Sequence, residues 1–291
     1  MKLLVTGAGG QIGKEVAREL LSHGYEVRAL DMQPIPADLR EMGAELVYAD
    51  IANSLEMLRA PQGCDGVLHV AAIPNPIRQR HLLLDSNIKG TYNVLEGAQA
   101  AGIEKVIITS SVGALGFSYP VRPIYPDYLP VDVKHPRAPQ DVYGLSKEVN
   151  ELTAEMFTRR HGMTTIAIRP PYVLDLSRAA RDGWLQRMMQ RHSTEYENAL
   201  WGYIDTKDLA RAFRLAWEAK MEPAGHNIFF VMADDVLSED TPRTLIERFM
   251  PQLMKYADKV DKCFYDLAPA REKLGFVAET SWRDAIAQAK S

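Results

Sequence analysis

An apolar run that leads straight into a cluster of glycines constrains this chain more than any other feature of its sequence. The run KLLVTG is followed by TGAGGQIG at residues 6–13, and an amphipathic stretch, IGKEVARELLSHG, overlaps its end. Glycines let the backbone turn tightly and approach a pyrophosphate, and the N-terminus of the next helix supplies free N–H groups and a positive dipole end. The order of strand, glycine turn and helix therefore predicts a dinucleotide-binding loop. Its residues would be Gly7, Gly10, Gln11, Ile12 and Gly13.

An acidic residue at the end of the second apolar run supports this interpretation. Asp31 lies where a carboxylate would accept hydrogen bonds from the adenosine ribose hydroxyls. A carboxylate there repels a 2′-phosphate, and the following residues, MQPIPADL, include no arginine that could bind one. Arg28 should point to the opposite face of the strand, because it is an odd number of positions away. The sequence therefore predicts NAD rather than NADP as the cofactor.

Short apolar runs alternate with helical patterns along the chain. The runs are KLLVTG, YEVRALD, AELVYAD, GVLHVAA, KVIITSS, TTIAIRP and, late in the sequence, NIFFVM. Near-continuous apolar strands separated by helices predict an α/β fold with a doubly wound parallel sheet, covered by helices on both faces. The alternation loosens after residue 169. We therefore expect a dinucleotide-binding domain over 1–168 and a smaller substrate-binding lobe over 169–291, with 201–232 returning to the first domain.

Composition and charge exclude several classes of protein. The chain has 291 residues, of which 46% are hydrophobic and 25% charged, and a net charge of −4. This charge gives no reason to expect nucleic acid or an anionic membrane as a partner, and no apolar run approaches membrane-spanning length. Two widely separated cysteines suggest a reducing compartment, so we expect a cytoplasmic protein. No histidine forms a metal-ligand spacing with another histidine or a cysteine, so no metal is expected.

The stretch YGLSK at residues 143–147 places a tyrosine four positions ahead of a lysine. Residues spaced in this way lie on one helix face, so Tyr143 and Lys147 can point into one cleft. Free tyrosine has a pKa of about 10, and a nearby ammonium favours the phenolate and lowers that value. Tyr143 could then take a proton from a substrate alcohol while a hydride passes to the nicotinamide.

Several motifs together resemble those of the extended short-chain dehydrogenases/reductases, in the NAD-dependent epimerase/dehydratase family. The chain resembles the family's TGxxGxxG loop and YxxxK pair at the residues quoted above. Four further stretches carry the resemblance: YADI, HVAA, NIKGTYNVLEGA and TSSVGALG, in which leucine replaces the usual tyrosine. The resemblance extends over nearly the whole length of the chain.

The resemblance implies a Rossmann fold with a smaller C-terminal lobe and assigns further roles. Ser111 takes the position of the catalytic serine, beside Tyr143 and Lys147, and the lysine would also bond the nicotinamide ribose. Residues implied to contact the cofactor are Asp50, Ile51, Ala71, Ala72, Asn87, Tyr143 and Lys147. Asn87 could instead simply start a helix. Family analogy also implies a homodimer that pairs the helices containing NIKGTYNVLEGAQAAG and YGLSKEVNELTAEMF.

Candidate substrate residues are fewer. The segment PNPIRQRH follows the fourth apolar run, where loops of this fold reach their ligand. Asn75 and Arg78 could contact the substrate there, together with Ser111 and Tyr172. Arg80 or His81 could serve in place of Arg78, and a solvated loop is an equally good interpretation of the segment. His69 lies within an apolar run and is expected to be a core residue rather than a catalyst.

Two departures from the family pattern bear on the substrate. Nucleotide-sugar members usually carry N-V-Y-G-P where this chain has RPPYVLDL, and R-D-Y-I-H-V-x-D where it has WGYIDTKD. Trp201 thus replaces an arginine that grips the diphosphate, which disfavours a diphosphate-linked substrate. The run SS…G…YP and the tryptophan-bearing segment instead resemble those of uronate dehydrogenases, which act on unlinked sugar acids.

The sequence leaves three hypotheses about function. The first is an NAD-dependent dehydrogenase that oxidises a sugar or sugar-acid hydroxyl and releases NADH. The second is an epimerase or dehydratase of the nucleotide-sugar type that returns the hydride and keeps NAD bound. The third is a non-catalytic dinucleotide sensor, which the presence of Ser111, Tyr143 and Lys147 argues against.

Overall fold

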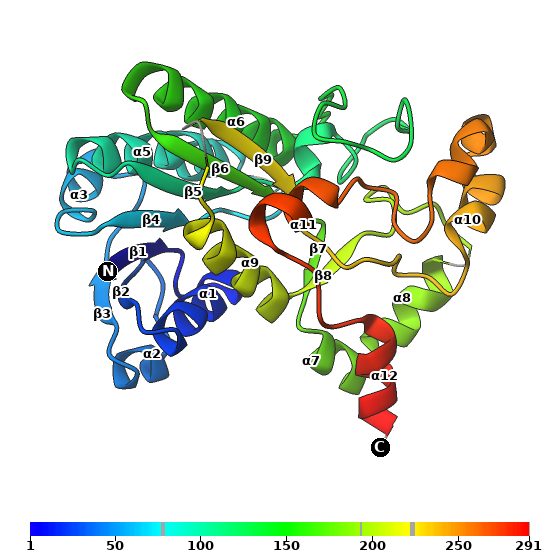
Figure 1. Ribbon diagram of the computed structural model, residues 1–291, viewed down its shortest axis with the longest axis horizontal. Helices are drawn as coiled ribbons and strands as arrows, with labels where there is room; N and C mark the ends of the chain where they lie inside the picture. The colour runs from blue at the N-terminus through cyan, green and yellow to red at the C-terminus, as the bar shows by residue number, and fades with distance from the viewer. Residues whose placement is uncertain (77–78, 193, 222–224, 291) are drawn as a thin grey trace.

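The chain folds around one large sheet that carries helices on both faces, with a smaller lobe at one end (Figure 1). The structure is a computed structural model that describes residues 1–76, 79–192, 194–221 and 225–290.

Seven parallel strands form the large sheet, in the order β3-β2-β1-β4-β5-β6-β9. They are β1 (Lys2–Thr6), β2 (Glu26–Asp31), β3 (Glu45–Tyr48), β4 (Gly66–His69), β5 (Lys105–Thr109), β6 (Thr164–Arg169) and β9 (His226–Phe230). Each strand coincides with one of the seven apolar runs, so the predicted doubly wound parallel sheet is confirmed. The strand order reverses between β1 and β4. In open α/β sheets, ligands bind beyond the carboxyl ends of the strands at such a switch point.

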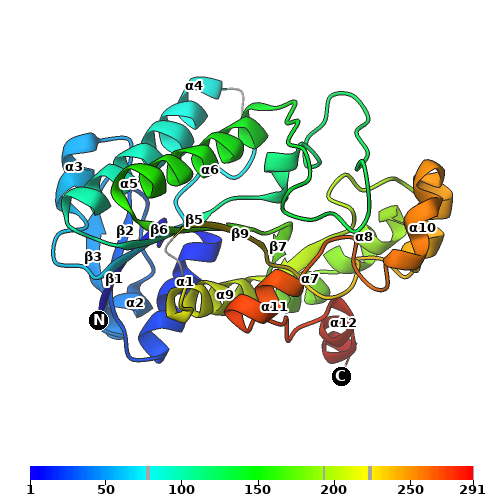
Figure 2. The same cartoon turned by 45° about the horizontal axis from the view of Figure 1, so that its top comes forward.

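Helices cover the two faces of this sheet, as the edge-on view of Figure 2 shows. One face carries α1 (Gln11–Ser22), α2 (Ala37–Glu41), α9 (Thr206–Glu218) and α11 (Ala268–Leu274). The other face carries α3 (Ser54–Arg59), α4 (Arg80–Leu83), α5 (Gly90–Ala100) and α6 (Val142–His161), and a π-helical turn, η1 (Leu84–Lys89), joins α4 to α5.

The sheet is buried on both sides because its strands are apolar at nearly every position. In β1, Leu3 and Val5 pack into the core under α1 and α9, whereas Leu4 packs into the core under α5. This alternation follows from the two-residue period of a strand. Helix α9 contributes Leu209 and Phe213 to the first core, as its apolar stripe predicts.

A smaller lobe lies beyond the carboxyl ends of the strands (Figure 1). It contains a two-stranded parallel sheet of β7 (Tyr172–Leu174) and β8 (Tyr203–Asp205). Around this sheet lie α7 (Leu176–Arg181), α8 (Trp184–His192), α10 (Pro242–Phe249), the 3₁₀ segment η3 (Pro251–Lys259) and α12 (Trp282–Lys290). Trp201 is fully buried in this lobe and packs against the rings of Phe249 and Phe264.

The two parts of the fold exchange segments of chain. Strand β9 pairs with β6 although β7, α7, α8 and β8 of the lobe lie between them in sequence, and α9 packs against α1. The division of the chain at residue 168 stays a prediction. Within the described ranges, no helix is long and apolar enough to cross a membrane.

Candidate active site

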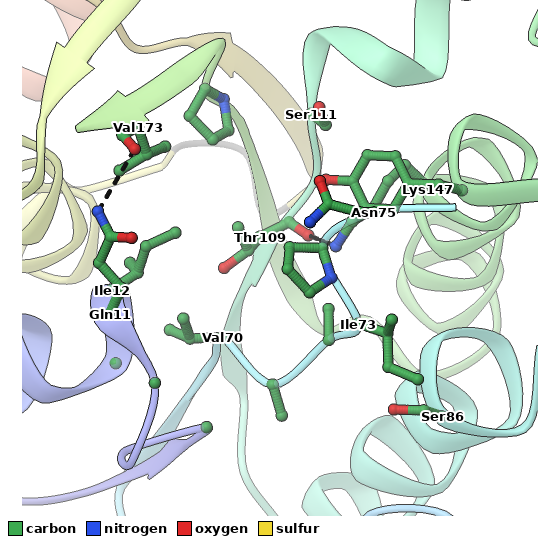
Figure 3. A pocket seen from close by; sticks show the side chains of 18 of the residues that line it. Gln11, Ile12, Val70, Ile73, Asn75, Ser86, Thr109, Ser111, Lys147 and Val173 are labelled. Atoms are coloured by element: carbon green, nitrogen blue, oxygen red, sulfur yellow. Dashed lines mark hydrogen bonds between the residues drawn. The ribbon is translucent and has the colours of Figure 1, made fainter. Parts of the chain in front are cut away.

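A cavity of about 730 Å³ opens at the carboxyl ends of the large sheet, beside the switch point between β1 and β4. Figure 3 shows Gln11 and Val173 on one side of this cavity and Ser111, Asn75 and Lys147 on another. Its wall contains most residues that the sequence nominated: Gly7, Gly10, Gln11, Ile12, Gly13, Asp31, Asp50, Ile51, Ala71, Ala72, Asn75, Ser111, Tyr143, Lys147 and Tyr172. Residues as far apart in sequence as Gly7 and Tyr172 therefore meet in one cavity.

The glycine loop is shaped by close approaches of backbone to backbone. Gly7 has a φ of +74°, and a Cβ there would lie 2.6 Å from the amide nitrogen of Ala71. A Cβ on Gly13 would lie 2.0 Å from the carbonyl oxygen of Gly7. Only glycine fits at these two positions. Helix α1 begins directly after Gly10 with no side-chain cap and no acidic residue in its first turn, so its N–H groups are free to bind an anion.

Asp31 lies in the cavity wall next to the glycine loop. It ends β2, and its carboxylate accepts hydrogen bonds from the backbone N–H groups of Gly9, at 2.9 Å, and Gln33, at 2.8 Å. One carboxylate therefore both braces the glycine loop and faces the cavity. Arg28 points away, as predicted, and donates to the carbonyl oxygens of Ala60 and Gln62.

These residues fit a bound dinucleotide. The free N-terminus of α1 suits a pyrophosphate, the Asp31 carboxylate can accept from ribose hydroxyls, and Ile51 offers an apolar surface for a base. Asp50 lies beside Ile51 in the wall, where its carboxylate accepts from the N–H of Ala52 at 2.9 Å. The role of each of these residues in binding stays a prediction.

Two buried polar side chains hold the wall behind Ala71 and Ala72. His69 contacts the hydroxyls of Thr6, at 2.7 Å, and Thr91, at 2.9 Å, and burial lowers its pKa to about 3. This neutral, fully bonded histidine is the core residue that the sequence suggested.

Asn87 is also fully buried, outside the residues that line the cavity. It accepts from the N–H of Ile73 at 2.8 Å and donates to the Ile73 carbonyl at 3.0 Å. It thereby fixes the segment that follows β4. A direct contact between Asn87 and the cofactor stays a prediction.

The first turns of α6 place Tyr143 and Lys147 in the cavity wall. Asp141 caps this helix by accepting from the N–H groups of Tyr143, at 2.8 Å, and Gly144, at 2.9 Å. The Lys147 ammonium donates to the carbonyl oxygen of Thr109 at 2.8 Å and lies 5.6 Å from the centre of the Tyr143 ring. Both side chains thus face one cleft, as their spacing predicts.

The predicted lowering of the tyrosine pKa is wrong for this structure. Burial raises the pKa of Tyr143 to about 12, and a hydrogen bond with Ser111 opposes that rise only in part. Burial likewise lowers the pKa of Lys147 to about 8, opposed by the charge of Glu151. Desolvation is the largest cause of both pKa shifts, because burial disfavours the charged form of each group.

The two serines after β5 point in different directions. Ser111 caps the short 3₁₀ segment η2 (Val112–Leu115) by accepting from Gly113 N–H at 2.9 Å, and it faces Tyr143. Ser110 donates to Glu151 at 2.5 Å, and Glu151 forms a bidentate, buried ion pair with Arg169. Of the two, Ser111 is therefore the one placed beside the tyrosine hydroxyl.

The cavity wall also contains residues that the sequence did not single out, among them Ser86, Thr109, Ser118, Tyr119, Pro170, Glu197 and Ala199. Tyr119 donates to the side-chain oxygen of Asn75 at 2.7 Å, and its ring packs edge-on against Tyr143, with centroids 5.9 Å apart. The run SSVGALGFSYP contains Tyr119, but no spacing rule marks it. Glu197 lies in a segment without periodicity and gave no signal.

The candidate substrate residues in the loop after β4 differ in their position relative to the cavity. Asn75 lines the cavity, whereas Arg80 and His81 are exposed and outside its described lining. Arg78 lies outside the described residues. Among the parts of the chain that are described, no group of three or more potential metal ligands was found.

The family of the chain follows from comparison with known proteins. Residues 3–231 match the family described as the NAD dependent epimerase/dehydratase family. The chain belongs to this family, which confirms the predicted class of extended short-chain dehydrogenase/reductase and NAD as its cofactor.

Three curated relatives illustrate the range of the family. Cinnamoyl-CoA reductase 1 of Oryza sativa subsp. japonica is 30% identical over 74% of this chain and 67% of its own length. L-arabinose 1-dehydrogenase (NAD(P)(+)) of Haloferax volcanii is 29% identical over 80% of this chain and 89% of its own. A uronate dehydrogenase of Pseudomonas syringae pv. tomato is 31% identical over 58% of each chain.

Solved structures show the same fold. A short-chain dehydrogenase/reductase superfamily protein from Agrobacterium tumefaciens, crystallised with bound NAD, superimposes with a TM-score of 0.74. The two chains are 23% identical, and the match covers 99% of this chain and 96% of the other.

Proposed function

We propose that this protein is an NAD-dependent oxidoreductase that transfers a hydride from a hydroxyl-bearing carbon of a sugar or sugar acid to NAD. The observation that carries the proposal is the meeting of Ser111, Tyr143 and Lys147 at the middle of the cavity. The glycine loop and Asp31 lie toward one end, and hydroxyl and carboxylate side chains lie toward the other. Bound NAD would accept the hydride there.

Tyr143 acts as the general base in this proposal. Its hydroxyl removes the proton of the substrate alcohol, and Ser111 orients the substrate oxygen beside it. Because burial raises the pKa of Tyr143 to about 12, the phenolate needs positive charge close by. Lys147 supplies that charge at neutral pH, since its pKa is about 8.

NAD is preferred to NADP in this account. Asp31 already accepts two backbone hydrogen bonds and presents its charge where a 2′-phosphate would lie. Met32 and Gln33 follow it in the cavity wall, and Arg28 is engaged on the opposite face. No cation therefore lies next to Asp31 to receive a phosphate among these residues.

A sugar-like substrate is supported by the polar character of the far end of the cavity and by two relatives. The names of the L-arabinose dehydrogenase and the uronate dehydrogenase both refer to unlinked sugars. The position where nucleotide-sugar members carry a diphosphate-binding arginine is Trp201. Here its side chain is wholly buried among aromatic rings.

An epimerase or dehydratase of the same family is the alternative. It is favoured by the superposition with UDP-glucose 4-epimerase of Thermotoga maritima, at a TM-score of 0.72. The two functions differ in what happens to the hydride: an epimerase returns it to the sugar and keeps the cofactor bound, whereas a dehydrogenase releases NADH.

Incubation of the purified protein with NAD and a panel of free and nucleotide-linked sugars tests the proposal. We expect a free sugar to produce one NADH for each molecule oxidised. Failure of every free sugar to produce NADH, while a nucleotide-linked sugar is converted without it, would refute the proposal in favour of the alternative.

We also propose a homodimer and a cytoplasmic location. Helices α5 and α6 pack side by side, and they expose Tyr92, Leu145 and Leu152, each at least 40% accessible. Such exposed apolar side chains suit an interface between copies of the chain. Solution scattering should give a dimer mass for the wild type and a monomer mass for Leu152→Glu, and a wild-type monomer at micromolar concentration would refute the dimer. The proposed cytoplasmic location rests on the two free cysteines, which agree with a reducing compartment.

A further inference from the structure

We propose that Glu197 determines substrate specificity by selecting an uncharged sugar and rejecting a sugar acid. The inference rests on the proposed function, because it names the substrate class of the same site. Glu197 is the acidic residue at the substrate end of the cavity, and its side chain is 11% exposed.

The backbone that carries Glu197 is held in an unusual conformation. Leu200 and Trp201 both have positive φ angles, 52° and 53°, although neither is glycine and both are fully buried. Such a conformation costs free energy and persists only when the surrounding structure enforces it. The turn is closed by a hydrogen bond of 2.9 Å from the N–H of Leu200 to the carbonyl of Glu197. Its effect is to present Glu197 and Ala199 to the cavity.

One oxygen of the carboxylate accepts a hydrogen bond, and the other lies beside a buried imidazole nitrogen that has no hydrogen-bond partner among the described residues. Its Oε2 lies 3.3 Å from Nε2 of His192, a buried side chain whose Nδ1 donates to the carbonyl of Leu237 at 2.6 Å. Its Oε1 accepts from the N–H of Ala199 at 3.3 Å. Each carboxylate oxygen has more than one lone pair, so both can still accept hydrogen bonds from a ligand.

The surroundings of Glu197 contain hydroxyl groups and one exposed cation, Arg191, which is paired with Glu195 outside the cavity wall. Burial comes first among the causes that raise the pKa of both Tyr119 and Tyr172, and the charge of Glu197 adds to each rise, so the carboxylate lies near both phenols. Of the described residues in the cavity wall, Lys147 alone is cationic, and its ammonium is bonded to Thr109.

This arrangement distinguishes two kinds of sugar. The hydroxyls of a neutral sugar can donate to Glu197, whereas the carboxylate of a sugar acid has no proton to donate and carries the same charge. A buried acceptor that loses its donor, next to a second negative charge, disfavours the acid. Position 201, where nucleotide-sugar members carry an arginine, is a tryptophan packed into the lobe core. No cation at that position therefore offsets the repulsion.

A matched pair of sugars tests the inference, since D-galactose and D-galacturonate differ only in a CH₂OH or carboxylate group at one carbon. We would measure kcat/KM for both with NAD, and binding of both to the enzyme–NADH complex by thermal shift. The wild type should prefer galactose in both measurements. Glu197→Gln should lower the galactose-to-galacturonate ratio of kcat/KM by at least about tenfold. Glu272→Gln, at an exposed glutamate of α11 that does not line the cavity, is the matched control and should leave the ratio unchanged.

The outcomes separate this inference from the proposed function. If no free sugar of the panel produces NADH, the proposed function fails, and the thermal-shift comparison still decides the role of Glu197. A wild type that binds or oxidises galacturonate at least as well as galactose overturns the inference. So does a Glu197→Gln variant with the wild-type ratio, and so does the absence of binding by both sugars.

Discussion

The two ends of the cavity are built in different ways. The cofactor end is made of backbone: glycines that no other residue could replace, a free helix N-terminus, and a carboxylate that bonds the loop itself. The substrate end is made of side chains from segments far apart in sequence, such as Asn75, Tyr119 and Glu197. Backbone geometry tolerates little change, whereas side chains can be exchanged one at a time. This difference fits a fold whose members bear names that refer to different substrates.

The largest effect is expected where the two ends meet. Tyr143→Phe removes the hydroxyl and keeps the ring, which would still pack against Tyr119. A positioned general base typically contributes about 10²–10⁴-fold to the rate, so turnover should fall by that factor or to background. Affinity for NAD, measured by calorimetry, should stay close to that of the wild type. Near-native turnover on the true substrate would show that the active site has been assigned wrongly.

A second substitution should distort the glycine loop and weaken NAD binding without changing the substrate end of the cavity. In Gly13→Ala the new Cβ would lie 2.0 Å from the carbonyl oxygen of Gly7, a backbone atom. Overpacking of this kind costs about 1–3 kcal/mol of unfolding free energy, and the distorted loop should also bind NAD at least about tenfold more weakly. Gly10→Ala, whose Cβ would meet the same oxygen at 3.2 Å, should have a smaller effect on both quantities. Equal effects in the two variants would argue against a loop fixed by close backbone contact.

Lys147→Ala should slow turnover and weaken NAD binding, by about tenfold for a lost charged hydrogen bond. Without the ammonium the phenolate of Tyr143 is less stable, so the remaining activity should shift to higher pH. The pKa of Lys147 is about 8, so the wild type itself loses this charge above that pH. The ratio of wild-type to variant turnover should therefore be largest below pH 8 and should decrease as the pH rises through it. A ratio that is independent of pH would contradict an electrostatic role.

The smallest of these effects concerns the choice of cofactor. Asp31→Ala removes the charge that opposes a 2′-phosphate, together with two hydrogen bonds to the loop. We expect the preference for NAD over NADP to decrease by about tenfold, partly because NAD itself binds less well. Separate titrations of NAD and NADP measure this. Equal or tighter binding of NADP by the wild type would refute the proposed preference.

The same contrast explains what could be predicted from the sequence. The strands, the glycine loop and the position of Asp31 follow from local patterns, because a two-residue period, a positive φ and a strand end are properties of neighbouring residues. Tyr143 and Lys147 could be paired because four residues span one helical turn. The pKa of Tyr143 could not be predicted, since it depends on burial that arises only when distant segments pack. Glu197 and Tyr119 were missed for the same reason, since irregular segments bring them to the cavity.

The fate of the hydride tests the central claim most directly. The substrate identified in the sugar panel would be prepared with deuterium at the carbon that is oxidised and incubated with NAD, and released nucleotide and sugar would be analysed by mass spectrometry. We expect the deuterium in free NADH, with one labelled NADH for each oxidised sugar. Deuterium that returns to a rearranged sugar while the cofactor stays bound, or NADH that carries no deuterium, would contradict the account.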